Sequence, residues 1–175
     1  MKSIHLPQTC HGLRADLFTY FPLLQTQPLK DFLNDVFAYD ELVQAYLSPM
    51  RIQPPHAPRV VLAVDVATAF ARKVRHSIWL QSTQERELAI VAALVKYCGH
   101  FLVALRHQPS DPNEASQART FALENALRNL RYASPALGQT LSAVLEKNAG
   151  DDFDSMQVKR IHNVLITAGM QRKLP

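Results

Sequence analysis

Residues Ser82 to Leu105 read STQERELAIVAALVKYCGHFLVAL, and this stretch decides the fold. Its first residues form a capping box, in which the Ser82 oxygen accepts an early backbone N–H and the Glu85 carboxylate reaches back. The middle of the stretch is apolar nearly all round, a pattern typical of helices that are buried on every side. We therefore expect a central helix around which the rest of the chain packs.

Upstream of this stretch, Pro28 suits the first turn of a helix, and Asp40 suits the N-cap of another over Leu42–Leu47. Prolines recur in Ser48–Pro58, which is therefore expected to be a loop. The valines of Arg59–His76 are typical of strands. However, the apolar residues of this segment keep helical spacing and the polar residues do not alternate, which favours a helix.

Downstream, Ser134-Pro135 marks a helix start and Asp154 suits the N-cap of a final helix. The helix before Ser134 is expected to bury an apolar face made of Phe121, Leu123, Leu127 and Leu130. The pattern predicts an all-α fold of about seven helices in a single compact bundle. One domain is expected over residues 1–175, with residues 1–13 as an irregular N-terminal segment.

The composition is that of an ordinary globular protein, with 47% hydrophobic and 19% charged residues. Cys10 and Cys98 form no CxxC pair, which makes a disulfide framework or a structural zinc site unexpected. Together with the absence of a leader-like start or an apolar stretch long enough for a bilayer, this predicts a cytoplasmic protein without a membrane partner. The formal charge of +4 is mild and spread out.

Familiar catalytic motifs are missing from the sequence. No Walker-type phosphate loop, GxGxxG, HExxH or GxSxG pattern occurs. The seven histidines show no i, i+4 pairing that would place two ligands on one helix face. The sequence therefore predicts no complete catalytic site, no metal and no cofactor.

Two segments, Glu41–Lys73 and Glu85–Leu105, and their order in the chain resemble the HD-domain superfamily of metal-dependent phosphohydrolases. The resemblance is strongest to the HD-like domain of MobH-type conjugative relaxases, and it implies an HD-like bundle. It is carried by the apolar residues that place the two metal-binding helices of the family, which match Val61, Leu62, Val66, Ala67, Leu88, Ala89, Ala92, Ala93 and Leu94.

The resemblance also implies where metal ligands belong, and those positions hold other residues. The first histidine of the family falls on Val64, its His-Asp doublet on Lys96 and Tyr97, and its late aspartate on Gly169. Val64 has no donor atom, Lys96 brings a positive charge, and a tyrosine is a poor ligand at neutral pH. The resemblance therefore implies a degenerate metal site.

Three functions follow as expectations. The first is a non-catalytic HD-like helical module that binds a partner protein or nucleic acid, with a link to a mobile element implied by the resemblance. The second is a metal-dependent phosphohydrolase with a rearranged site built from His56, Asp65, His76 and His100, which requires two antiparallel core helices. The third is a structural helical homodimer, with candidate contacts at Trp79, Leu80, Tyr97 and Phe101.

Nucleic-acid binding has its own candidate residues, namely Arg119, Arg128 and Arg131. Arg128 and Arg131 are i, i+3 neighbours and would share a helix face. Further basic residues lie near the end of the chain, at Lys159, Arg160, Arg172 and Lys173. Steeply salt-dependent binding is the behaviour expected of such a surface.

Overall fold

The computed structural model describes residues 24–39, 42, 49–52, 59–106, 114–147 and 152–170. The fold is all-α, as the sequence predicts, with six helices and one short strand pair in this part of the chain. The helices are α2 (Gln27–Val36), α4 (Ala63–Arg75), α5 (Thr83–Arg106), α6 (Glu114–Ala133), α7 (Pro135–Glu146) and α8 (Met156–Met170). The N-terminal segment 1–13 and most of the helix expected over Leu42–Leu47 lie outside the described residues.

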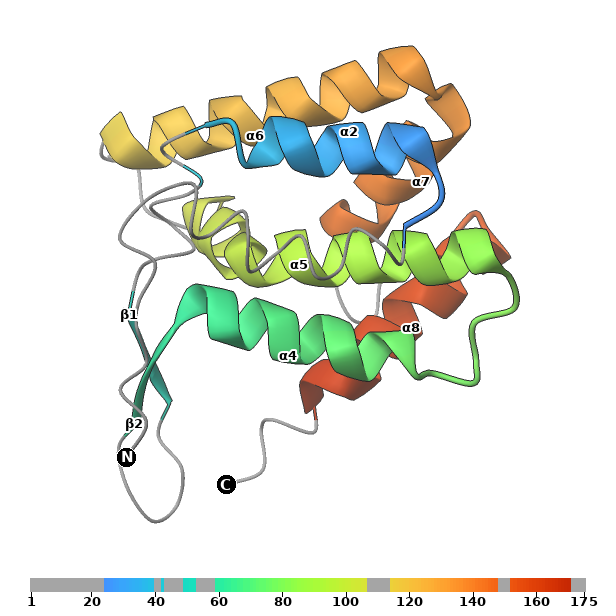
Figure 1. Ribbon diagram of the computed structural model, residues 1–175, viewed down its shortest axis with the longest axis horizontal. Helices are drawn as coiled ribbons and strands as arrows, with labels where there is room; N and C mark the ends of the chain where they lie inside the picture. Colours follow the sequence, from blue (N-terminus) through green and yellow to red (C-terminus); the bar gives the residue numbers. More distant parts are fainter. Residues whose placement is uncertain are drawn as a thin grey trace.

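The centre of the molecule is α5, which confirms the expectation for this stretch. Every side chain from Leu88 to Val95 is at most 1% exposed. Figure 1 shows α2 and α6 on one side of α5 and α4 and α8 on the other, and α7 packs against α5, α6 and α8. Figure 1 also shows that α4 and α5 run antiparallel. Among the described helices, none is both long enough and apolar enough to cross a bilayer.

The N-terminus of α5 is closed by the predicted capping box. Ser82 Oγ accepts the N–H of Glu85 at 3.1 Å, and the Glu85 carboxylate accepts the N–H of Gln81 at 2.9 Å. The same carboxylate forms an ion pair with Arg160 of α8, whose Nε lies 3.4 Å from Oε2. The hydrogen bond from the Arg160 guanidinium is the main reason why the pKa of the Glu85 carboxyl lies below its ordinary value.

The next two residues of α5 fasten it to two other helices. The Arg86 guanidinium donates to the carbonyl oxygen of Arg75 in the last turn of α4. The buried Glu87 carboxylate accepts hydrogen bonds from the hydroxyl and, at 3.2 Å, from the N–H of Thr26, the N-cap of α2. The positive guanidinium of Arg86 lies at the C-terminal end of α4, and the negative carboxylate of Glu87 lies at the N-terminal end of α2. These are the helix ends whose dipoles attract a positive and a negative charge, respectively. Three consecutive charged residues of α5 therefore tie it to α8, α4 and α2.

The strand pair corrects two expectations. β1 (Pro49–Ile52) pairs antiparallel with β2 (Arg59–Leu62), so the segment expected to be a loop begins with a strand. The helix expected from Arg59 starts only at Ala63, because its β-branched valines at the front pair with β1. Pro49 is tolerated because it is the first residue of its strand, a position where proline is commonly found.

Other corrections concern helix faces and ends. Phe121 is 62% exposed, and Ala122 and Ala126 are buried beside Leu123 and Leu130 on the inner face of α6. At the start of α8, Ser155 rather than Asp154 supplies the cap, because Ser155 Oγ accepts the N–H of Val158 at 3.4 Å. The first error concerns which face of α6 is buried, and the second moves the cap of α8 by one residue. Neither changes the order of the elements.

The α6–α7 pair depends on a glycine. A Cβ added to Gly138 of α7 would lie 2.6 Å from Arg131 Cα and 2.8 Å from Arg131 N on α6. These are backbone atoms, which cannot move aside as a side chain can. Gly138 therefore lets the two helices approach closely just after the connection at Ser134.

Candidate functional site

The end of α4 leads into a tight, hydrogen-bonded turn. The N–H groups of His76 and Ser77 donate to the carbonyl oxygens of Lys73 and Val74, at 3.3 and 3.1 Å. The N–H of Trp79 then donates to Ser77 Oγ at 3.3 Å. These short-range bonds, typical of turns stabilised by serine, fix the backbone between α4 and α5.

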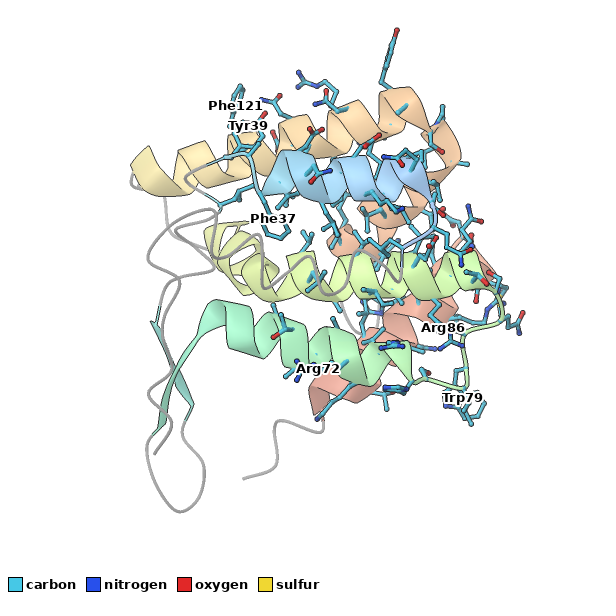
Figure 2. All side chains as sticks on the ribbon, in the orientation of Figure 1. Phe37, Tyr39, Arg72, Trp79, Arg86 and Phe121 are labelled. Atoms are coloured by element: carbon cyan, nitrogen blue, oxygen red, sulfur yellow. The ribbon has the colours of Figure 1, made fainter. Side chains whose placement is uncertain are left out.

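Two large apolar side chains project from this turn. Ile78 is 87% exposed and Trp79 is 71% exposed, although Val74 and Leu80 on either side are buried. Figure 2 shows Trp79 pointing away from the bundle at the connection between α4 and α5. Adjacent exposed apolar side chains held in place by buried neighbours are a feature of interaction sites.

A cleft of about 260 Å³ opens beside this turn. Lys73, His76 and Trp79 line one side of it, and Val164, Thr167 and Ala168 of α8 line the other. Its volume lies just below the usual range for pockets that hold drug-sized ligands. The cleft is therefore of a size for a small group, and Lys73, His76, Ser77 and Thr167 contribute polar side chains to its lining.

The surroundings of the cleft carry positive charge. The last turn of α4 contains Arg72, Lys73 and Arg75, and the sequence has no Asp or Glu between Asp65 and Glu85. Within the described residues, neither Lys73 nor Arg75 has an ion-pair partner. Glu85, at the end of this acid-free stretch, is buried and bound to Arg160. The positive charge of Lys73 and Arg75 is therefore not neutralised by an acidic residue nearby in the sequence.

Helix α8 extends this charge. No Asp or Glu follows Asp154 in the sequence. Lys159, Asn163 and Thr167 are exposed and spaced by four residues, so they lie on one face of α8. Thr167 lines the cleft, and Lys159 lies about 12 Å further along the helix axis. We use the name Trp79 surface for Lys73, His76 and Trp79 at the cleft, together with the exposed cations Arg75 and Lys159 of the same two helices.

The degenerate ligand positions fall on three helices. Val64 lies in the first turn of α4, Lys96 and Tyr97 lie in α5, and Gly169 lies near the end of α8. Since α4 and α5 are antiparallel, the first three positions belong to the same end of this helix pair (Figure 1). The side chains at all of these positions lie outside the described part of the structure.

The rearranged-site residues are not all brought together. Asp65 lies in the first turn of α4, whereas His76 follows its last residue, which separates them by about 16 Å along the helix axis. His100 lies in the second half of α5, at the Asp65 end of the pair (Figure 1). His56 lies outside the described residues. Among the residues that are described, no group of three or more His, Cys, Asp or Glu side chains is arranged to hold a metal ion.

The basic residues expected on α6 lie away from the Trp79 surface. Arg128 and Arg131 are exposed, and Arg131 packs beside Gly138 of α7. The side chain of Arg119 lies outside the described part. Of the expected dimer contacts, Leu80 is 5% exposed and unavailable to a partner, while Trp79 is exposed.

Buried His162 has a structural role in the part of the chain that is described. It is 1% exposed, and its Nε2 lies 2.9 Å from the carbonyl oxygen of Lys147. Its ring centroid is 5.0 Å from that of Phe153, and the Lys147 Nζ lies 5.8 Å from the Phe153 centroid. These contacts close the connection between α7 and α8.

The comparisons with known proteins add no relative. No protein-family model, no curated protein and no solved structure matches this chain. The function is therefore inferred from the geometry and chemistry of the Trp79 surface.

Proposed function

We propose that this chain is a non-catalytic helical module that binds nucleic acid through the Trp79 surface. The observation that carries the proposal is the projecting indole of Trp79, which lines a cleft together with Lys73. The segment around both residues, from Val66 to Gln84, contains no Asp or Glu. Lysine and arginine side chains bind phosphates and release condensed counterions, while an exposed aromatic ring contacts bases.

The position of the charges supports the same function. Lys73 and Arg75 lie at the end of α4, where cations also stabilise the helix dipole. That local role does not account for Lys159 on α8, whose face is shared with Thr167 at the cleft. Exposed cations on two packed helices, α4 and α8, fit an extended polyanion better than they fit a single small anion.

The non-catalytic part of the proposal rests on the resemblance of the α4 and α5 segments to HD domains. The implied ligand positions hold Val64, Lys96 and Tyr97, which do not supply the imidazole and carboxylate groups that such chemistry uses. The HD-like relationship and the link to a mobile element belong to this proposal and rest on the same resemblance.

The test is a binding titration with fluorescently labelled oligonucleotides at several salt concentrations. The variant Lys73→Gln with Arg75→Gln is expected to bind at least tenfold more weakly at low salt. The slope of log K against log salt is expected to fall by about 0.7 to 0.9 for each phosphate that the variant no longer neutralises.

The matched control is Arg128→Gln with Arg131→Gln, which removes the same charge from α6. It is expected to bind like the wild type, and circular dichroism checks that both variants are folded. Loss of binding in the control variant alone would show that the interface lies on α6 and not at the Trp79 surface. Salt-independent binding, or none to single or double strands, would overturn the proposal and favour a protein partner at Ile78 and Trp79.

A further inference from the structure

We infer that the nucleic acid bound at the Trp79 surface is a single strand, and that one unpaired base stacks on Trp79 at the mouth of the cleft. The inference rests on the proposed function and names the substrate class of that same site. It starts from the indole, because a flat aromatic face can stack only on a base whose own face is uncovered. Within a duplex the base faces are covered by their neighbours.

The element that presents Trp79 favours an unpaired strand. A duplex is normally read by a helix or a β-ribbon placed in a groove. Here the projecting element is the short turn from His76 to Gln81, and its tip carries two apolar side chains. Such a tip presents an aromatic platform, which is the means by which proteins bind single strands irrespective of sequence.

The cleft beside the indole has the size and chemistry for a base. Its volume is about 260 Å³, and Thr167 and His76 place polar side chains at its walls. Ser77 also lines the cleft, and its hydroxyl oxygen accepts the Trp79 N–H, which leaves the O–H able to donate. A base edge offers both donors and acceptors to such groups.

Cations on α4 and α8 are available to the phosphates of the bound strand. Lys73 lines the cleft itself, and Arg75 lies two residues further on in the last turn of α4. Lys159 is exposed on the same face of α8 as Thr167, which lines the cleft. A strand whose base contacts Trp79 therefore lies next to Lys73, and the exposed Lys159 is available to the same strand further along α8.

The platform is held in position before binding. The Arg86 guanidinium donates to the carbonyl oxygens of Arg75 and of Ser77, the latter at 3.3 Å. Leu80 is buried directly after Trp79 and anchors the turn in the core. A backbone that is fixed in this way loses little conformational entropy when a ligand binds, which favours measurable affinity from a small contact.

Trp79 is the single tryptophan of the chain, so its fluorescence reports on the site without a label. We would titrate the wild type at low salt with oligo-dT, oligo-dA and oligo-rU of about 12 nucleotides, a length within common site sizes. A duplex of the same length is titrated in parallel. Quenching of the indole emission by the single strands, with at least tenfold weaker binding of the duplex, is expected. The DNA and RNA arms show which sugar the site prefers.

Three variants complete the test, with binding followed by anisotropy of labelled strands. Trp79→Ala is expected to weaken single-strand binding about tenfold without changing the salt slope, because the indole neutralises no phosphate. Trp79→Phe is expected to retain most of the affinity. Tyr132→Ala, which removes a 93% exposed aromatic side chain from α6 and does not line the cleft, is the matched control and is expected to bind like the wild type.

Different results would overturn the proposal of nucleic-acid binding and the inference that an unpaired base stacks on Trp79. If neither single strand nor duplex binds, the proposed function itself is wrong. If duplex binds as tightly as single strand, or if single strands bind without quenching Trp79, nucleic-acid binding stands and the stacking inference is overturned. Equal affinities of the wild type and Trp79→Ala for single strands would overturn it as well.

Discussion

The buried carboxylate of Glu87 in α5 caps the N-terminus of α2 by accepting hydrogen bonds from Thr26, 61 residues earlier in the chain. Thr26 is the N-cap residue of α2, but its own side chain makes no capping bond. Its hydroxyl instead donates to Glu87. A residue of one helix therefore supplies the cap of another, and this contact fixes where α2 starts on the central helix.

We expect Glu87→Ala to lower the free energy of unfolding by about 2 kcal/mol, because it leaves the N–H of Thr26 without its charged acceptor in a partly buried place. Urea denaturation followed by circular dichroism measures the change. Gln27→Ala, which removes only an exposed hydrogen bond to Asp31, is the control and is expected to change stability little. Equal effects of the two substitutions would contradict the capping role of Glu87.

The Glu85–Arg160 pair makes stability depend on pH in acid. The pKa of Glu85 is lowered from its ordinary value of 4.5, chiefly by the hydrogen bond from Arg160. The stabilisation is therefore fully present above pH 4.5 and is lost as the pH falls through the lower pKa of the folded state.

Glu85→Gln removes this titration, so its stability deficit relative to the wild type is expected to be constant above pH 4.5 and to shrink below it. Urea denaturation of both proteins from about pH 7 to about pH 3 measures the deficit. A deficit that stays constant over this whole range would show that the carboxylate charge does not contribute.

Ser82→Ala is expected to lower the free energy of unfolding by about 1 kcal/mol, because the N–H of Glu85 loses the acceptor that lies 3.1 Å away. Thr83→Ala, at the exposed first residue of the same helix, is the control and is expected to be nearly neutral. Thermal unfolding of both variants distinguishes the loss of a cap from a general effect at this position.

Gly138→Ala is expected to destabilise the protein by about 1–3 kcal/mol, although alanine normally favours a helix over glycine. The reason is the close approach of Gly138 to the backbone of Arg131. Adding Arg131→Ala to this variant is expected to restore little stability, because the added Cβ still meets backbone atoms at 2.6 and 2.8 Å. Stabilisation by Gly138→Ala alone would refute the close packing of α6 and α7.

The sequence predicts α5 well because its signals agree with one another. A capping box precedes a stretch that is apolar on all sides, and no other regular structure accommodates both. By contrast, Val60 and Val61 fit both a helix and a strand, and only their pairing with Arg51 and Met50 of β1 decides between them. That pairing depends on residues on the other side of a proline-rich segment, which local spacing does not reveal.

The face of α6 is misjudged for a different reason. Phe121 is the largest apolar residue of its segment, yet Ala122 and Ala126 occupy the inner face. Alanine contributes little to an apolar pattern, so the direction of a helix rich in alanine is poorly defined by sequence. Small residues at these positions suit a helix that packs against both α2 and α7.

The Trp79 surface is also only partly predictable. The stretch without Asp or Glu between Asp65 and Glu85, which contains Trp79, is a signal present in the sequence. The contribution of α8 is not, because Thr167 reaches the cleft only through the packing of α8 beside α4. Nor does the sequence reveal that Leu80 turns into the core while Trp79 turns out.

The three consecutive charged residues at the start of α5 have a consequence for the order in which the chain folds. The contacts of Arg86, Glu87 and Glu85 close segments of 11, 61 and 75 residues, respectively. Because the entropic cost of closing a loop grows with its length, the α4–α5 hairpin is expected to form first. The same turn of α5 is then expected to bind α2 and α8 in later steps. One short segment of the chain therefore makes both the contacts that form early and the contacts that form late in folding.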